Sequence, residues 1–373
     1  MDYDAYEAEV PADPQLMALP HPIRVPAAQP AYVQVMSKML KPAAWSTLSG
    51  LFRNNSLMTS DILGKVIDQP GFEPLRRLVQ LSARLPGGSE VGNLYGNMLC
   101  VRQAVAPQPY FRIDDTLCEL LVNTDLDDDI PLDVLKAPYP RFYVEFGQSR
   151  KLPLHLPNHL SGEHILEGAY VEVGTREEVG RGLYVLLTAS PLGKRNALDD
   201  ATHAVFLPLE KHMSLQQAIH WSFDKGNENA REHGLITPPV DTLAPALECL
   251  NFLAKTLLYI GLPEARRSVH PDRTQWQKSH SALKSTAKRS KAERKGRQLV
   301  DYILISAPTS QQEEPRGMDD TRKGPKPHWR RGHYRMQAHG PQHSLRKLTF
   351  ISPLLVNASD GSTVETAPEY RVR

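Results

Sequence analysis

Four histidines lie close together near the C-terminus of the chain, at His328, His333, His339 and His343. Imidazole nitrogens bind zinc, and histidines spaced in this way occur in zinc fingers, but a zinc finger also needs a pair of cysteines. The cysteines of the chain lie far from this segment and from one another, at Cys100, Cys118 and Cys249. On a strand, the odd step from His328 to His333 also places the two rings on opposite faces. We therefore predict no metal and no cofactor.

A nuclease would need histidines or carboxylates that activate water, usually together with a metal ion. The carboxylates would come from the acidic run at 123–133, which contains Asp125, Asp127, Asp128 and Asp129. This run lacks the glycine and the terminal glutamate of a calcium-binding loop, and it is typical of an acidic turn. We predict no catalytic residues, and keep a metal-dependent nuclease as an alternative function beside a phage structural or assembly protein.

The segment around the histidines is predicted to form a basic β-hairpin. In the strand HWRRGHYRMQ, alternate residues share a face, so that Trp329, Arg331 and Arg335 lie on the same side. Gly332 permits a bulge or the close approach of another backbone. Residues 345–356 supply the partner strand, and AHGPQHS closes the hairpin. A row of cations beside an indole suits phosphates or an acidic peptide, although cations also protect an exposed sheet edge. The predicted binding residues are Trp329, Arg330, Arg331, Gly332, His333, Arg335, Arg346 and Lys347.

A second basic segment at 278–297 is predicted to be a helix, with Glu293 as its one acidic residue. Its cations spread around the helix rather than forming one stripe. Like charges this close repel one another unless a polyanion screens them, which favours a nucleic acid or an acidic partner over a merely solvated segment. The binding residues predicted here are Lys284, Lys288, Arg289, Lys291, Arg294 and Lys295.

Charge is distributed unevenly along the chain, although the formal net charge is only +2. Residues 261–350 hold 20 Lys and Arg against 8 Asp and Glu, whereas residues 1–260 hold 22 against 31. The basic end is suited to a polyanion or an acidic surface, unless the two ends neutralise each other within the fold.

The composition also indicates where the protein acts. No apolar run approaches the roughly eighteen residues of a membrane span, and the acidic start MDYDAYEAEVPADP lacks the apolar region of a secretory signal. The few scattered cysteines fit a reducing compartment. We therefore predict a cytoplasmic protein that makes no contact with a membrane.

The elements that must position the basic segments follow from the hydrophobic pattern. Segments rich in β-branched and aromatic residues, with short connections, predict an antiparallel meander of strands at 141–146, 168–175, 180–190 and 203–209. Residues 214–225 are predicted to be a helix capped by Ser214, residues 241–260 a helix at the centre of the core, and residues 298–308 a buried strand. The predicted fold class is α+β, with a central antiparallel sheet flanked by helices and a basic C-terminal β-hairpin.

The predicted organisation is a flexible arm at 1–30, an α+β core domain at 31–263, a basic helix and strand at 264–308, a linker at 309–327, the basic hairpin at 328–357 and a tail at 358–373.

The C-terminal segment resembles the signature of a family of proteins from phages, plasmids and other mobile elements, which includes a type V-A anti-CRISPR protein. The resemblance lies in the order P-H-x-R-R-G-H-aromatic, a glycine-containing turn, a basic strand and P-x-x-V-N. The matching residues are Pro327, His328, Arg330, Arg331, Gly332, His333, Tyr334, Arg346, Pro353, Val356 and Asn357. Weaker similarities are YPRFYVEF at 139–146 and LECLNFLAKTLLYIGLPE at 247–264.

This resemblance implies a non-enzymatic regulator that lowers the production of a bacterial protein such as a Cas nuclease. The anti-CRISPR member of the family acts during nuclease synthesis, by recognising the N-terminal part of the nascent nuclease, and the nuclease mRNA is then lost. The implied partners are a nascent polypeptide or an acidic protein surface, and RNA or the ribosome. The chain departs from that member in its longer N-terminal part and in the basic segment at 278–297, so that its target can differ.

Overall fold

The computed structural model describes residues 14–30, 99–149, 151–158, 162–176, 179–190, 200–209, 213–232, 240–282, 298–308 and 328–356, with a few isolated positions among the others. The predicted linker at 309–327 and tail at 358–373 lie outside the described residues, as does nearly all of the chain between 38 and 98. Within the described residues, every helix is too short or too polar to span a lipid bilayer.

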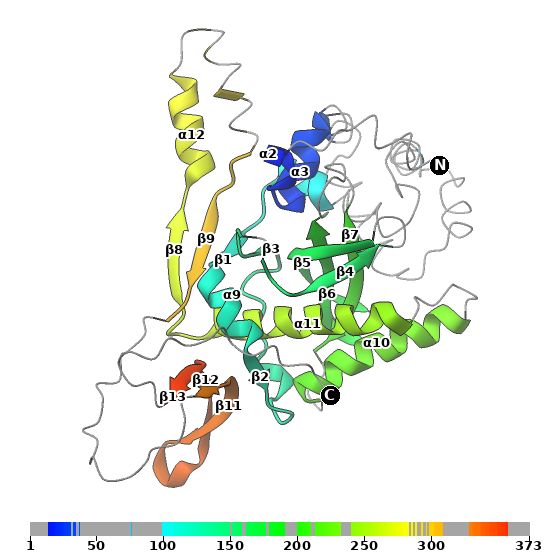
Figure 1. The fold of residues 1–373 in the computed structure, drawn as a ribbon, viewed down its shortest axis with the longest axis vertical. Helices are drawn as coiled ribbons and strands as arrows, with labels where there is room; N and C mark the ends of the chain where they lie inside the picture. The colour runs from blue at the N-terminus through cyan, green and yellow to red at the C-terminus, as the bar shows by residue number, and fades with distance from the viewer. Residues whose placement is uncertain are drawn as a thin grey trace.

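A large mixed sheet forms the centre of the molecule, with strands in the order β7-β6-β5-β3-β1-β9-β8 and β4 paired to β5 (Figure 1). These strands are β1 (Tyr110–Ile113), β3 (Arg141–Phe146), β4 (His155–Asn158), β5 (Gly162–Arg176), β6 (Gly180–Ser190), β7 (Ala201–Pro208), β8 (Arg266–His270) and β9 (Tyr302–Ser306). The helices around it are α2 (Pro14–Met17), α3 (His21–Ala28), α9 (Asp115–Val122), η1 (Leu132–Val134), α10 (Leu215–Glu232), α11 (Val240–Gly261) and α12 (Asp272–Ser281).

The predicted α+β class is confirmed, and so is the antiparallel pairing of β3, β5, β6 and β7. The sheet as a whole is not antiparallel, because β1 pairs in parallel with both β3 and β9. The physical reason is the long connection between β1 and β3, which includes α9 and is long enough for a parallel crossover. Strands β8 and β9 are part of this same sheet, so the predicted division at residue 263 does not interrupt it.

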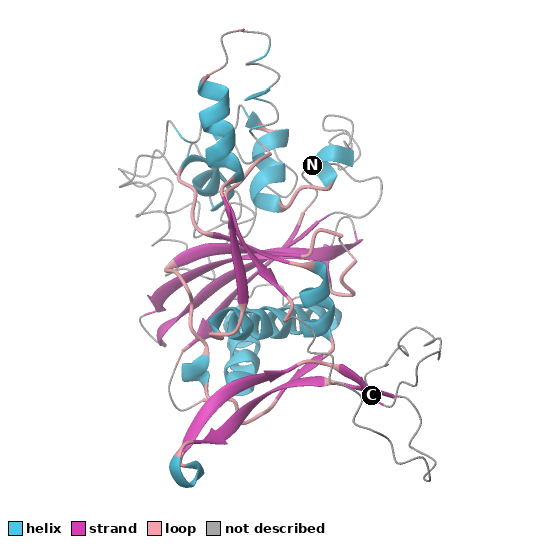
Figure 2. Ribbon diagram, turned by 90° about the vertical axis from the view of Figure 1, so that its left-hand side faces the viewer, coloured by secondary structure: helices cyan, strands magenta, loops and turns pink. Residues whose placement is uncertain are grey.

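The two faces of the sheet are apolar, and each is covered by helices. On one face, Phe142, Val144 and Val185 belong to the main core together with the buried side chains of α11. On the other face, Tyr143 and Tyr170 pack with residues that include Ile23 of α3. Figure 2 shows the resulting layers, with α3 on one side of the sheet and α10 and α11 on the other. The predicted central role of the helix at 241–260 is therefore confirmed.

Local signals in the sequence explain where α10 begins. Ser214 accepts a hydrogen bond from the backbone NH of Gln217 at 3.3 Å, and its own NH donates to Oε1 of Gln217 at 2.9 Å. This reciprocal pair is a capping box, which satisfies donors that the first turn of a helix leaves free. The predicted cap at Ser214 is thus confirmed.

The N-terminal region differs from the prediction of a flexible arm. Residues 21–28 form α3, and residues 21–25 are buried. Pro22 is compatible with the start of a helix, because the first turn needs no NH donors, whereas Pro26 lies inside α3. The three cysteines are free and buried, as the sequence suggested.

A second, smaller sheet lies beyond α11, on the side away from the central sheet (Figure 2). It has the strand order β12-β11-β2, and its strands are β2 (Thr124–Leu126), β11 (Gly332–His339) and β12 (Leu345–Ile351). The turn between β11 and β12 contains η2 (Pro341–His343), and a further pair is formed by β10 (His328–Arg330) and β13 (Leu354–Val356). The predicted basic hairpin is therefore confirmed, with β2 as an additional strand.

Candidate interaction site

The inner face of the hairpin is fixed to α11 by two aromatic side chains. Tyr334 is fully buried, and its hydroxyl donates a hydrogen bond to the backbone carbonyl of Lys255 at 2.8 Å. The ring of Phe350, which is opposite Tyr334 in the register, lies 5.1 Å from the Tyr334 ring and 5.3 Å from that of Tyr259. Helix α11 is thus covered by apolar side chains on both sides, which explains why its apolar residues occupy most of its circumference.

At Gly332 the backbone of the hairpin pairs directly with the backbone of β2. Gly332 is paired with Thr124 of β2, and its NH donates to the carbonyl of Asn123 at 3.1 Å. A Cβ atom at this position would lie 2.6 Å from Cδ of Pro353, 2.7 Å from Oγ1 of Thr124 and 2.8 Å from the carbonyl oxygen of Ile351. The predicted close approach of another backbone is therefore confirmed, and only glycine fits this position without displacement.

Arg331 is not a free cation. Its Nη1 lies 2.9 Å from Oδ1 of Asp125, and both side chains are about half exposed. The acidic run at 123–133 therefore supplies the partner of an arginine beside the hairpin. An ion pair with this exposure contributes little to stability but fixes the direction of the guanidinium.

The outer face of the hairpin exposes the cations that alternate with the buried residues. We define the outer hairpin face as His333, Arg335, Gln337 and Lys347, which the register places on the side opposite Tyr334 and Phe350. Arg335, Gln337 and Lys347 are exposed, and His333 is half-buried. Among the described residues, neither Arg335 nor Lys347 has an ion-pair partner, so both charges are available to another molecule. Arg346 differs, because its Nη1 donates to the carbonyl of His343 at 2.7 Å within the turn.

The hairpin and the described start of the second basic segment do not share one surface. The hairpin and α12, which contains Lys278, lie at opposite ends of the longest axis (Figure 1). The distribution of charge along the chain could not predict this separation. The separation depends on the residues between the two segments, which form β9 of the central sheet. Lys288 is exposed, whereas the side chains of Trp329 and Arg330 lie outside the described residues. The same holds for Lys284, Arg289, Lys291, Arg294 and Lys295.

The histidines are spread along the hairpin. His333 and His339 lie at opposite ends of β11, and His343 lies in the turn. In the part of the chain that the structure describes, no three His, Cys, Asp or Glu side chains form a group that could hold a metal ion.

Lys255 connects α11 with the hairpin sheet through a partly buried ammonium group. Its Nζ donates to the carbonyl of Thr124 at 2.9 Å. Burial lowers the pKa of Lys255 from its ordinary 10.5 to about 8, and the attraction of Asp125 only partly opposes this. The cost of burying this charge is present at neutral pH and disappears as the pH rises above 8.

We expect the free energy of unfolding to reflect this titration. Between pH 8 and 9.5 the unfolded chain keeps the Lys255 proton while the folded protein loses it, so stability from this group should rise by about 2 kcal/mol. Urea unfolding of the wild type and of Lys255→Met at several pH values tests this. The difference between the two proteins isolates Lys255 from other titrating groups, and a pH-independent difference would contradict the prediction.

A buried ionic cluster on the opposite face of the sheet was not predicted. Arg24 is fully buried, and its guanidinium donates to both carboxylate oxygens of Glu167 at 2.8 and 2.9 Å and also to Asp200. The NH of His21 donates to Glu167 at 2.9 Å, and the His21 ring is hydrogen-bonded to the hydroxyl of Tyr170 at 2.9 Å. Burial lowers the pKa of His21 and keeps it neutral. In the sequence, a charged residue between the apolar Ile23 and Val25 was the one sign of a buried ion pair. Its acidic partners could not be identified, because they are distant in the sequence.

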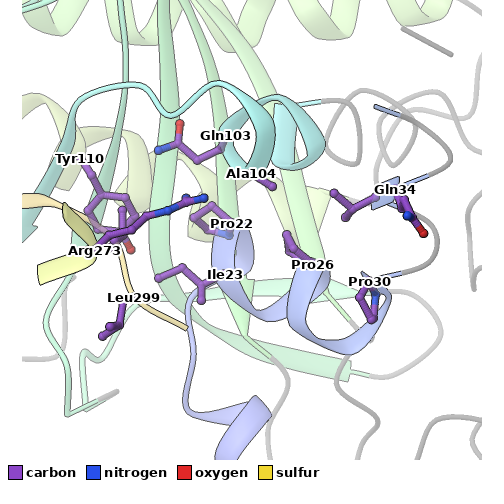
Figure 3. Close-up of a pocket in the computed structure, with 12 residues that line it drawn as sticks. Pro22, Ile23, Pro26, Pro30, Gln34, Gln103, Ala104, Tyr110, Arg273 and Leu299 are labelled. Carbon is purple, nitrogen blue, oxygen red and sulfur yellow. The ribbon is translucent and has the colours of Figure 1, made fainter. Parts of the chain in front are cut away.

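A mostly apolar cavity of about 530 Å³ lies beside α3 (Figure 3). Its lining includes Pro22, Pro26, Leu299 and Val300, and the Arg273 side chain extends across it toward Pro22 (Figure 3). Arg273 is the one charged residue among the described residues that line it. The cavity is on the α3 side of the central sheet, so it is not part of the hairpin surface.

A protein-family model matches a large part of the sequence. The model of the AcrVA2-like family, described as the anti-CRISPR type V subtype A2 family, matches residues 111–358. That range contains the central sheet, α11 and the hairpin. A solved structure described as the crystal structure of AcrVA2 is similar, with a TM-score of 0.45 and 12% sequence identity over 91% of this chain and 100% of that one. No curated protein matches the sequence.

Proposed function

The chain belongs to the AcrVA2-like anti-CRISPR family, and we propose that it opposes a type V-A CRISPR system by lowering the production of the Cas nuclease. In this proposal it acts without catalysis in the cytoplasm of a bacterial host, having entered on a phage or plasmid. It binds the nascent nuclease and the RNA or ribosome beside it, so that synthesis of the nuclease stops and the nuclease mRNA is lost.

One observation supports this mechanism most directly, namely the construction of the hairpin. Its inner face is held on α11 by Tyr334 and Phe350, while the exposed Arg335 and Lys347 have no ion-pair partner among the described residues. Rigidly presented cations suit the phosphates of RNA, because they bind without first breaking contacts within the protein.

We expect the double substitution Arg335→Ala and Lys347→Ala to weaken association with ribosomes or RNA and to reduce its dependence on salt. Each lost phosphate contact should lower the slope of log K against log salt concentration by about 0.7–0.9. Pull-downs from translating bacterial lysate, with and without ribonuclease, measure the association. Lys136→Ala with Arg181→Ala is the matched control, because these cations are also exposed but lie elsewhere.

The proposal as a whole is tested in cells that express a type V-A nuclease. The wild-type protein should lower nuclease protein and mRNA, and the hairpin variant should do so less. An unchanged salt slope in the variant would reject the hairpin as the cationic contact. Inhibition with full levels of nuclease protein and mRNA would reject the translational mechanism.

A further inference from the structure

Strand β8 is an edge of the central sheet, and its outer side has no partner among the described residues. It is last in the strand order and pairs only with β9. Figure 1 shows it at the left border of the molecule, where no other labelled element flanks it. The opposite edge strand, β7, is packed against α10, with the ring of His203 stacked 5.7 Å from that of Phe223. The two edges of the sheet therefore differ in how far they are covered.

The side chains of β8 are exposed on both faces of the strand. Arg266, Arg267, Ser268 and Val269 are all exposed, and Val269 has 74% of its surface accessible. Successive residues of a strand face opposite sides, so this end of the sheet is open above and below as well as along its edge. Proteins usually cover such edges or shorten them, because unpaired backbone groups attract other strands.

The two arginines of β8 have different roles. Arg267 is used within the protein, since its guanidinium donates to the carbonyls of Ile260 at 2.6 Å and Leu262 at 2.8 Å. This fixes the start of β8 against the end of α11. Arg266 has no ion-pair partner among the described residues, so it leaves a free positive charge on β8, on the face opposite the exposed Val269.

We propose that β8 binds an extended segment of the nascent target polypeptide as an additional strand of the central sheet. The unpaired NH and C=O groups of β8 would bind the peptide backbone, Arg266 would attract an acidic side chain, and Val269 would contact an apolar one. A nascent chain suits this site because it is presented before it folds, with its backbone groups still unpaired. This inference rests on the proposed function and adds the place and mode of peptide recognition.

Charge favours a peptide over a second copy of this protein. A second β8 strand is itself basic and offers no acidic side chain to Arg266. An acidic peptide instead gains attraction from Arg266. The bound segment is therefore an extended chain with acidic and apolar side chains, rather than another β8.

Overlapping synthetic peptides that tile the N-terminal part of a type V-A nuclease provide the probe for the full-length protein. At least one acidic peptide should bind and should slow amide hydrogen exchange within residues 266–270. Two versions of each binding peptide are then compared, one N-methylated at the odd-numbered amides and the other at the even-numbered amides. One of the two versions should bind about tenfold or more weakly, because methylation removes the main-chain hydrogen bonds to β8. The inference is overturned if no peptide binds or if neither methylated version binds more weakly. It is also overturned if the slower hydrogen exchange appears only outside residues 266–270.

Substitutions then connect binding with position. Val269→Asp should weaken peptide binding by a similar factor, because it places a negative charge beside the acidic peptide at a site exposed enough to spare the fold. Val105→Asp is the matched control at another exposed valine, and it should bind like the wild type. Equal binding by both variants, or a concentration-dependent dimer that Val269→Asp disrupts, would overturn the inference. Unchanged nuclease protein and mRNA in cells would instead reject the proposed function, whatever the peptides do at β8.

Discussion

Replacing Arg24 by methionine is expected to lower the free energy of unfolding by about 3–5 kcal/mol, which is the typical cost of removing one partner from a buried ion pair. The guanidinium is fully buried and is shared by Glu167, Asp200 and the carbonyl of Leu19. Methionine fills much of the same volume but removes the guanidinium that Glu167 and Asp200 share on the α3 face of the sheet. Urea denaturation at neutral pH measures the effect.

A matched variant separates the buried pair from ion pairs in general. Arg141 also pairs with a glutamate, with Nε of Arg141 2.6 Å from Oε1 of Glu172, but the Arg141 side chain is 45% exposed. Arg141→Met should cost at most about 1 kcal/mol, because water screens the pair. Similar losses in both variants would show that burial is not the cause.

Replacing Gly332 by alanine is the second change with a large expected effect. The added Cβ would overlap the ring of Pro353, the hydroxyl of Thr124 and the carbonyl of Ile351. Of these, the ring and the carbonyl cannot simply rotate away, so β11 must move from the chain at residues 351–353. Overpacking of this kind costs about 1–3 kcal/mol, and we also expect a loss of anti-CRISPR activity, since the outer hairpin face would be displaced.

Gly261 at the end of α11 provides the control, because a Cβ atom there would have no neighbour within 4 Å. Gly261→Ala should change stability little. Hydrogen exchange should show faster exchange within residues 332–351 in Gly332→Ala than in Gly261→Ala. Normal protection of the hairpin together with full activity in Gly332→Ala would show that the close contact with β2 is dispensable.

Much of the fold follows from local sequence patterns. The meander of β3, β5, β6 and β7, the cap at Ser214 and the hairpin around Gly332 each depend on residues near one another in the chain, so periodicity and turn chemistry identify them. The parallel pairing of β1 and β9 depends on segments separated by most of the core, and nothing in YFRI alone specifies its neighbours.

The candidate site was predictable in its parts but not in its arrangement. The alternation of residues along a strand correctly predicted that Arg335 and Tyr334 lie on opposite faces of the hairpin. The lack of a side chain at Gly332 correctly predicted a close approach of another backbone. The partner of Arg331 and the distance between the hairpin and α12 depend on tertiary structure, which charge along the chain does not report. The ionic cluster around Arg24 was missed for the same reason, because Glu167 of β5 and Asp200, just before β7, are distant from it in the sequence.

The position of α11 between two sheets has a consequence for how the protein is synthesised. Strands β11 and β12 follow α11 in the chain, so the ribosome releases the helix before it releases the hairpin that covers it. Until Tyr334 and Phe350 emerge, one apolar side of α11 has no native cover. We therefore expect an incomplete chain that ends before β11 to bind chaperones or aggregate. Correct assembly around α11 would then have to wait until β11 and β12 have been synthesised.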